Sequence, residues 1–362
     1  MLDLMPHGKD IYNKSIKQRG TAMTAPTKKH IYLATVTLMS AIGLAACADK
    51  PAEQSATADT QAQTSTTEAA TPSADAVAPT GDITIKTATG DVTIAGNPHP
   101  LAVYDMTAMQ NLAVLGVPVE GMPADLRLTN LKAANTPDAA EIGTVLEPNL
   151  EALNALQPKA IIVGSRMAEK AEELGKIGTV LNLTIDTKNP YEATKQQLTD
   201  FGKLFGKEAE ATAAISDIDA AIAAAKQAAA GKGNGLAIMV NGNKLSAYGD
   251  KSRFGFLHTA FGIPMADANI EDARHGQPIS FEYLQKINPD WLFVVDRGAA
   301  IGEEGESAEV VLDNPLMHGT KAWKNKQIVY LSPDSYLAFG GYYQWLNDAQ
   351  IVTDAFNAKT AQ

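Results

Sequence analysis

The segment Ser280–Arg297, SFEYLQKINPDWLFVVDR, predicts the architecture of the chain because an earlier segment, Asn149–Arg166, repeats its layout. In each copy a glutamate is followed seven residues later by a proline and eight residues after that by an arginine, and the two copies are 131 residues apart. The matched residues are Glu151, Pro158 and Arg166 in the first copy and Glu282, Pro289 and Arg297 in the second.

Each copy has the pattern of a helix, a proline stop and a buried strand. Apolar residues recur at helical spacing before the proline, and an unbroken apolar run follows it, Ile161–Val163 in one copy and Leu292–Val294 in the other. Such a run suits a parallel strand that is covered on both faces. The match indicates a duplicated α/β unit, although two common helix-proline-strand units could also match by chance.

The rest of the globular part alternates predicted strands and helices, which favours a parallel sheet in each half. The alanine-rich stretch 208–230 predicts one long helix with Gly231 as its stop. The predicted fold is therefore α/β, with two lobes that have central, mainly parallel sheets and are joined by one long α-helix. The predicted boundaries are 82–205 for the first lobe, 206–232 for the linking helix and 233–362 for the second lobe.

The first 46 residues have the features of a secretory signal, with Met23 as a second candidate start. Lys28 and Lys29 precede a mostly apolar stretch that is shorter than the roughly 20 residues of a membrane span. It ends in Leu-Ala-Ala-Cys47, which resembles the bacterial lipobox and so predicts a lipidated cysteine. An ordinary signal followed by a free thiol is the alternative. Residues 47–81 are predicted to be the anchor and a disordered tether.

The charge of the mature chain argues against nucleic acid as a partner. Removal of residues 1–46, which carry six basic and two acidic side chains, changes the net charge from −11 to −15. After Cys47 the chain has nineteen lysines but only five arginines. Lysine is thus the general surface cation, and an arginine is a candidate for planar, bidentate contact with a carboxylate, phosphate or catecholate. An ordinary ion pair remains the alternative for each arginine.

Three of these arginines are expected around one cleft. Arg166 and Arg297 follow matching strands, at the sheet edge where open α/β sheets bind ligands. Arg253, in Ser252–Gly255, follows a glycine-rich turn after another predicted strand. Three neighbouring guanidinium groups repel one another unless an anion lies between them, so an acidic ligand is implied.

The chain resembles the substrate-binding lipoproteins of ABC importers for iron siderophores, in particular the catecholate type related to enterochelin-uptake (enterobactin-uptake) proteins. The resemblance covers about residues 98–358 and implies a class III substrate-binding protein with a helical backbone. The motifs that carry it are Ser252-Arg253-Phe254-Gly255, Arg274-His275-Gly276, Asn288-Pro289-Asp290, Val294-Val295-Asp296-Arg297 and Tyr330-Leu331.

By this resemblance, Arg166, Arg253 and Arg297 line the pocket and face a ferric catecholate. His275 and Tyr336 fall where some family members supply two iron ligands to a siderophore that brings only four oxygens. From the residues alone, His275 is more typical of a capping or hydrogen-bonded residue before a helix, and Tyr336 of the core. The run 332–341 also departs from the family pattern.

Glu151 and Glu282 match the glutamates that related proteins present to arginines on the importer's membrane subunits. From the residues alone, both belong to a solvated helix face.

The predicted protein is a monomeric, lipid-anchored extracytoplasmic receptor that delivers a ferric siderophore to an ABC permease, with no enzymatic activity and no intrinsic cofactor. Alternatives are the same fold with haem, a corrinoid, another iron chelate or bare zinc or manganese, an exported hydrolase, or a structural envelope lipoprotein. G-x-S-x-G, H-E-x-x-H and P-loop motifs are absent. Bare-metal binding is disfavoured because the only histidines after Cys47 are His99, His258, His275 and His318.

Overall fold

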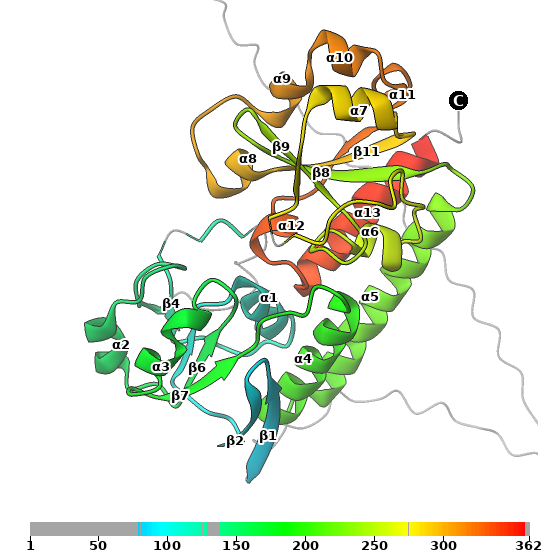
Figure 1. Ribbon diagram of the computed structural model, residues 1–362. Coiled ribbons are helices and arrows are strands. Elements are labelled where there is room, and N and C mark those ends of the chain that lie inside the picture. The colour runs from blue at the N-terminus through cyan, green and yellow to red at the C-terminus, as the bar shows by residue number, and fades with distance from the viewer. Residues whose placement is uncertain (1–78, 80, 125, 129–137, 274, 359–362) are drawn as a thin grey trace, which may run out of the picture. The chain divides into compact units, whose positions relative to one another are not determined.

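Two five-stranded sheets form the framework of the computed structural model (Figure 1). The model describes residues 79, 81–124, 126–128, 138–273 and 275–358, all within one compact unit, 70–362. The predictions for the signal, Cys47, most of the tether and Arg274 lie outside these residues. The first sheet has the order β5-β4-β3-β6-β7 with parallel pairing throughout. Its strands are β3 (Leu101–Val103), β4 (Gly121–Met122), β5 (Ala140–Glu141), β6 (Ala160–Val163) and β7 (Thr179–Asn182).

The second sheet has the order β10-β9-β8-β11-β12. Its strands β8, β11 and β12 are parallel, whereas β9 and β10 form an antiparallel edge that the sequence analysis does not predict. The prediction of mainly parallel central sheets is confirmed. The strands are β8 (Gly235–Asn241), β9 (Lys244–Tyr248), β10 (Gln277–Ile279), β11 (Trp291–Asp296) and β12 (Ile328–Tyr330).

The repeated sequence layout is also a repeated local structure. Asn149 and Ser280 cap helices α2 (Leu150–Leu156) and α7 (Phe281–Ile287), each with a side-chain oxygen that accepts a backbone N–H. Gln157 and Asn288 end the two helices in the left-handed region, with φ values of 51° and 49°. A proline then leads into β6 or β11, which are buried along almost their whole length.

The three long helices of the described chain pack together. Helix α5 (Glu208–Ala229) packs against both α4 (Pro190–Phe205) and α13 (Tyr342–Ala358). Its 22 residues correspond to a length of about 33 Å. The side-chain hydroxyl of Tyr191 donates to Asp219 on α5, and that of Tyr342 donates to Asp217.

The shorter elements complete the described chain. A hairpin with its turn around Thr89 is formed by β1 (Asp82–Thr87) and β2 (Gly90–Ala95), which pair antiparallel. The remaining helices are α1 (Met106–Val114), the 3₁₀ turn Ala168–Lys170, α3 (Ala171–Leu174), α6 (Phe256–Thr259), α8 (Arg297–Ile301), α9 (Ala308–Leu312), α10 (Pro315–His318), α11 (Lys321–Lys324) and α12 (Asp334–Leu337).

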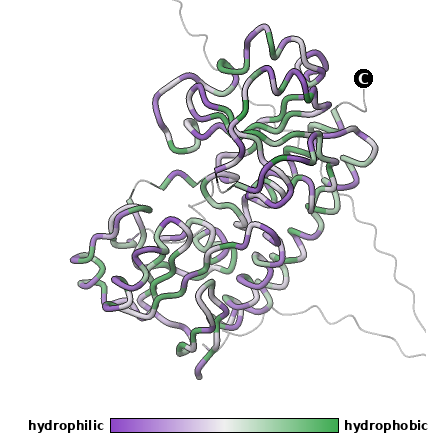
Figure 2. Tube along the Cα trace, viewed as in Figure 1, coloured by the Kyte–Doolittle hydropathy of each residue, from purple (hydrophilic) through white to green (hydrophobic). Residues whose placement is uncertain are grey.

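The main hydrophobic core extends across the predicted lobe boundaries. The boundaries themselves remain a prediction. One cluster of buried residues includes Phe201 on α4, Phe256 on α6 and Trp345 on α13. Figure 2 shows hydrophobic residues along the central strands of both sheets. Hydrogen bonds also tie α1, beside the first sheet, to the segment around α12. They run from Thr107 Oγ1 to Phe339 O (3.0 Å), from Gln110 Nε2 to Asp334 Oδ2 (2.9 Å) and from Tyr342 N to Asn111 Oδ1 (2.8 Å).

Within the described residues, no helix combines the length and the apolar character that crossing a bilayer requires.

Candidate ligand-binding site

A pocket of about 870 Å³ is lined by residues that follow strands of the first sheet and by residues on or after strands of the second. Loops after the parallel strands β3, β6, β7 and β11 reach it, as do β8, β9 and the segment around α12. The C-terminal ends of the parallel strands therefore carry the pocket, as expected for open α/β sheets.

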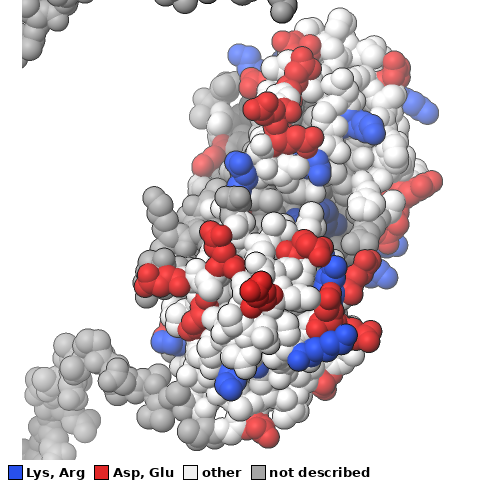
Figure 3. Space-filling model, turned by 90° about the vertical axis from the view of Figure 1, so that its left-hand side faces the viewer, with Lys and Arg blue, Asp and Glu red and all other residues white. Residues whose placement is uncertain are grey.

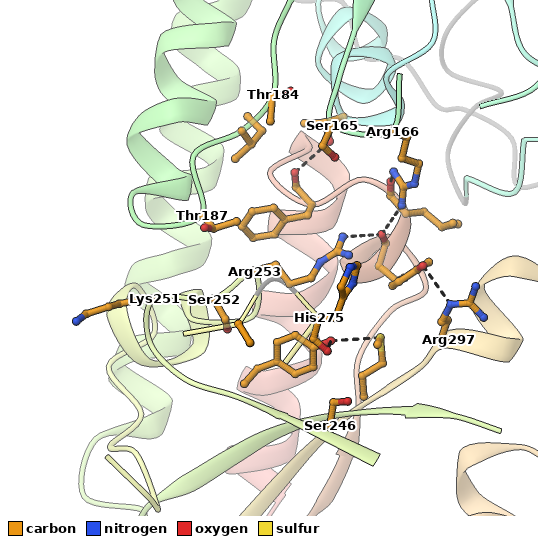
Figure 4. A pocket seen from close by; sticks show the side chains of 18 of the residues that line it. Ser165, Arg166, Thr184, Thr187, Ser246, Lys251, Ser252, Arg253, His275 and Arg297 are labelled. Atoms are coloured by element: carbon orange, nitrogen blue, oxygen red, sulfur yellow. Dashed lines mark hydrogen bonds between the residues drawn. The ribbon is translucent and has the colours of Figure 1, made fainter. Parts of the chain in front are cut away.

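The three arginines predicted to share a cleft all line this pocket. Figure 4 shows their side chains pointing toward one region, whereas Lys251 points away from it. Arg166 lies in the loop after β6, Arg253 in the turn before α6, and Arg297 begins α8 directly after β11.

The guanidinium groups converge on Tyr336. Arg166 Nη2 and Arg253 Nη2 both donate to the Tyr336 backbone carbonyl, at 2.9 and 2.8 Å, and Arg297 Nε donates to its hydroxyl at 3.2 Å. Their Cζ atoms lie 5.6, 5.0 and 5.8 Å from the centroid of its ring, within the range of cation–π attraction. Tyr336 thus occupies the centre of the cluster. It also packs partly against the core, as the residue-based interpretation expects.

Neutral groups, and not carboxylates, accept the hydrogen bonds of Arg166 and Arg253. Among the described residues neither forms an ion pair, and their hydrogen bonds go to backbone carbonyls. The Nε–H group of Arg253 is buried without a hydrogen-bond partner in the described structure. Burial, reinforced by the charge of Arg166, lowers the pKa of Arg253 to about 10. These two arginines therefore leave a concentrated positive charge in the pocket.

Arg297 differs because its Nη1 lies 3.0 Å from Glu303 Oε2 in an ion pair and 3.1 Å from Asn241 Oδ1. The hydrogen bond with Tyr336 is the main cause that raises the pKa of Arg297, and Glu303 adds to it.

Sequence reasoning misses Asp105, an acidic residue that lines the pocket and interacts electrostatically with Arg166. Asp105 follows β3 and caps α1, with its Oδ1 accepting Ala108 N at 2.8 Å. Burial raises the pKa of its carboxyl group, while the Ala108 N–H and the charge of Arg166 lower it. The available signal is a carboxylate placed directly after an apolar run, the same position that identifies Arg166 and Arg297.

His275 lines the pocket beside the arginines (Figure 4). It precedes strand β10 and not a helix, which corrects the capping interpretation, and no hydrogen bond of its ring is found among the described residues. Its backbone carbonyl accepts the hydroxyl of Tyr248 at 2.9 Å, which holds the turn in place. Among the described residues, no group of three or more His, Cys, Asp or Glu side chains is arranged to hold a metal ion.

Glu151 and Glu282 lie outside the pocket, at equivalent exposed positions in the first turns of α2 and α7. A hydrogen bond with the Ser280 side chain is the main cause that lowers the pKa of Glu282. Acidic side chains are spread over the face shown in Figure 3, so the cationic pocket contrasts with an acidic surface. The positive charge attracts an anion within the pocket, against the repulsion of the surrounding acidic surface.

The chain has two sheets with flanking helices, a long connecting helix and a pocket at the strand ends. These features define a substrate-binding protein of the helical-backbone class, class III. The model of the periplasmic binding protein family matches residues 101–335, and the chain belongs to this family. The predicted fold and family are confirmed.

Relatives of the chain are siderophore-binding proteins. It is 37% identical over 248 residues to the petrobactin-binding protein YclQ of Bacillus subtilis (strain 168), covering 68% of this chain and 78% of YclQ. It is 32% identical over 260 residues to the ferric-anguibactin-binding protein FatB of Vibrio anguillarum, covering 70% and 81%.

Solved structures of the family share this fold. The crystal structure of YclQ has a TM-score of 0.73 at 35% identity, covering 76% of this chain and 99% of YclQ. That of the periplasmic catecholate-siderophore binding protein VctP of Vibrio cholerae has a TM-score of 0.70 at 26% identity, covering 77% and 100%.

Proposed function

We propose that this protein is an extracytoplasmic receptor that binds a ferric siderophore with catecholate groups and delivers it to an ABC-type permease. The observation that carries the proposal is Arg253, a largely buried guanidinium that neighbours Arg166 and has no carboxylate partner in the described structure. A buried charge without a counter-ion is costly, so the pocket is built to receive an anion.

The charge of the ligand class fits the cluster. A ferric tris-catecholate carries three negative charges, which Arg166, Arg253 and Arg297 balance. Guanidinium groups also match the paired oxygens of a catecholate better than lysine does. The relatives named for petrobactin and ferric anguibactin support a siderophore ligand, and the catecholate-siderophore binding protein VctP supports the catecholate class.

A titration of intrinsic fluorescence with ferric siderophores tests this proposal. We expect tight binding of ferric enterobactin, a tris-catecholate, and weak binding of a neutral or cationic ferric trihydroxamate that presents the same metal. Equal affinity for the two would refute the catecholate assignment, and binding of haem or a corrinoid alone would replace it with the same fold for another cargo.

Two pocket residues are proposed to touch the iron of a siderophore that leaves coordination positions open. His275 provides an exposed imidazole, and Tyr336 provides a phenol oxygen that accepts a hydrogen bond from Arg297 Nε; both are donor types that suit iron. We expect a ferric bis-catecholate to show a charge-transfer band that shifts in both His275→Ala and Tyr336→Phe. Identical spectra for the wild type and both variants would exclude direct ligation.

The anchor and the docking residues complete the proposal. Cys47 would carry the lipid after removal of residues 1–46, with 47–81 as tether, and the receptor would act as a monomer. Glu151 and Glu282 would meet basic residues of the permease, because both are exposed and lie at matching positions of the repeat. The double reversal Glu151→Lys with Glu282→Lys should abolish siderophore uptake while leaving the fluorescence titration unchanged. Loss of binding in solution would place them on the wrong surface.

A further inference from the structure

We infer that Glu303 is a built-in competitor for Arg297, a carboxylate that an anionic ligand must displace before Arg297 can grip it with two hydrogen bonds. The inference rests on the proposed function, since it concerns how the same pocket selects an anion. It assigns a specificity role to a residue that lies outside the lining of the pocket.

The hydrogen bonds of Arg297 show why displacement is needed. A guanidinium offers bidentate contact along two edges, one formed by Nη1 and Nη2 and the other by Nε and Nη2. Glu303 Oε2 and Asn241 Oδ1 lie at Nη1, and the Tyr336 hydroxyl lies at Nε. Each edge therefore has one of its two donors already engaged by a protein acceptor.

Of the three protein groups that accept hydrogen bonds from Arg297, Glu303 is the one whose negative charge repels an anionic ligand. The other two arginines of the cluster donate to neutral backbone carbonyls, so Arg297 is the member with a carboxylate partner in the described structure. A ligand anion approaching Arg297 meets both a reduced positive charge and the repulsion of this carboxylate.

Glu303 is also placed to release Arg297 at little cost. Its backbone N–H donates to Gly298 O at 2.9 Å, which fixes the main chain at the end of α8, while its side chain is 58% exposed. Exposed ion pairs contribute little stability and their side chains reorient readily. An anion that binds Arg297 can thus replace Glu303 without unfolding the loop.

Two neighbours on the same loop provide charge-matched controls. Glu304 and Glu306 are exposed, and neither forms an ion pair among the described residues. Glu303→Gln, Glu304→Gln and Glu306→Gln each remove one negative charge, so a general electrostatic effect is the same in all three.

The test is a titration of the whole protein with ferric enterobactin. We expect Glu303→Gln to raise affinity about three- to tenfold over the wild type, and the two control variants to change it less than about twofold. In an Arg297→Gln background, Glu303→Gln should add nothing beyond Glu304→Gln, because the group for which Glu303 competes is gone. Equal gains in all three single variants, or a gain that persists without Arg297, would overturn the inference.

A second measurement separates this inference from the proposed function. Inorganic phosphate is a probe for any anion in the arginine cluster, and its effect is read as the rise in melting temperature. Glu303→Gln should increase that rise and Glu304→Gln should not. If the wild type binds no ferric catecholate, the proposed function fails. If the phosphate effect is the same in both variants, the inference about Glu303 fails.

Discussion

Replacement of Arg253 by methionine should stabilise the protein and abolish its ligand binding. Burial lowers the pKa of Arg253 from its ordinary value to about 10, which corresponds to about 3 kcal/mol against the charged form. The side chain keeps some contact with solvent, which reduces the penalty to about 2 kcal/mol. The loss of the hydrogen bond to Tyr336 O costs about 1 kcal/mol, and sulfur–aromatic contact of the methionine replaces the cation–π contact with the Tyr336 ring, leaving a net gain of about 1 kcal/mol.

Thermal melting and ligand titration check both halves of this prediction. A gain of about 1 kcal/mol raises the melting temperature by about 2–4 °C. Affinity for ferric enterobactin should fall by more than about 100-fold, because one partner of a buried charge pair would be lost. The cost of burying the charged Arg253 is present at neutral pH. It is relieved only as pH rises through about 10, because Arg253 then loses its proton in the folded state while it still holds it in the unfolded chain.

Arg127→Met is the matched control because it removes the same group from an exposed position outside the pocket lining. We expect its stability and affinity to stay close to those of the wild type. If Arg253→Met melts below the wild type, or binds the chelate as well as Arg127→Met does, the view of Arg253 as an unbalanced charge kept for the ligand is wrong.

Two further predictions concern stability. Gly302→Ala should destabilise the protein by about 1–2 kcal/mol, because Gly302 has φ +67°, a left-handed conformation that strains a residue with a Cβ. The end of the exposed Arg127 side chain, which lies close to Gly302, can move aside. Gly305→Ala, with nothing within 4 Å, is the control in denaturant titrations. Asp348 is buried and its pKa is raised to about 6, so the folded state holds its proton more tightly than the unfolded chain. The contribution of Asp348 to wild-type stability should therefore fall as pH rises from about 4 to 6. Melting curves across this range should show that this fall disappears in Asp348→Asn. An unchanged pH profile in Asp348→Asn would contradict the assignment.

The sequence contains enough information for the framework of the pocket. The offset of 131 residues predicts two equivalent helix-strand units, and caps at Asn149 and Ser280 confirm that the likeness extends to local geometry. Because parallel strands end at one edge, an arginine just after each apolar run could be assigned to the site from its position alone. That reasoning finds Arg166 and Arg297, and with equal attention it would have found Asp105.

The central place of Tyr336 could not be predicted in the same way. Its contacts with Arg166 and Arg253 join residues 170 and 83 positions apart. These contacts are made by the backbone carbonyl of Tyr336, and every residue has such a carbonyl, so the amino-acid sequence does not indicate them. The antiparallel edge β9–β10 has a related cause, since β10 is three residues long and is half-buried or exposed, too short to show an alternating pattern.

The segment that carries Tyr336 belongs to the second half of the chain but is held by the first. Gln110 on α1 donates to Asp334, and Arg166 donates to the carbonyls of Tyr336 and Leu337. A motion that separated the two sheets would break these buried and partly buried hydrogen bonds, so a large opening is costly. We therefore expect a ligand to enter mainly through changes at the Arg297 side of the pocket, where the contacts are side-chain contacts and one partner, Glu303, is exposed to solvent.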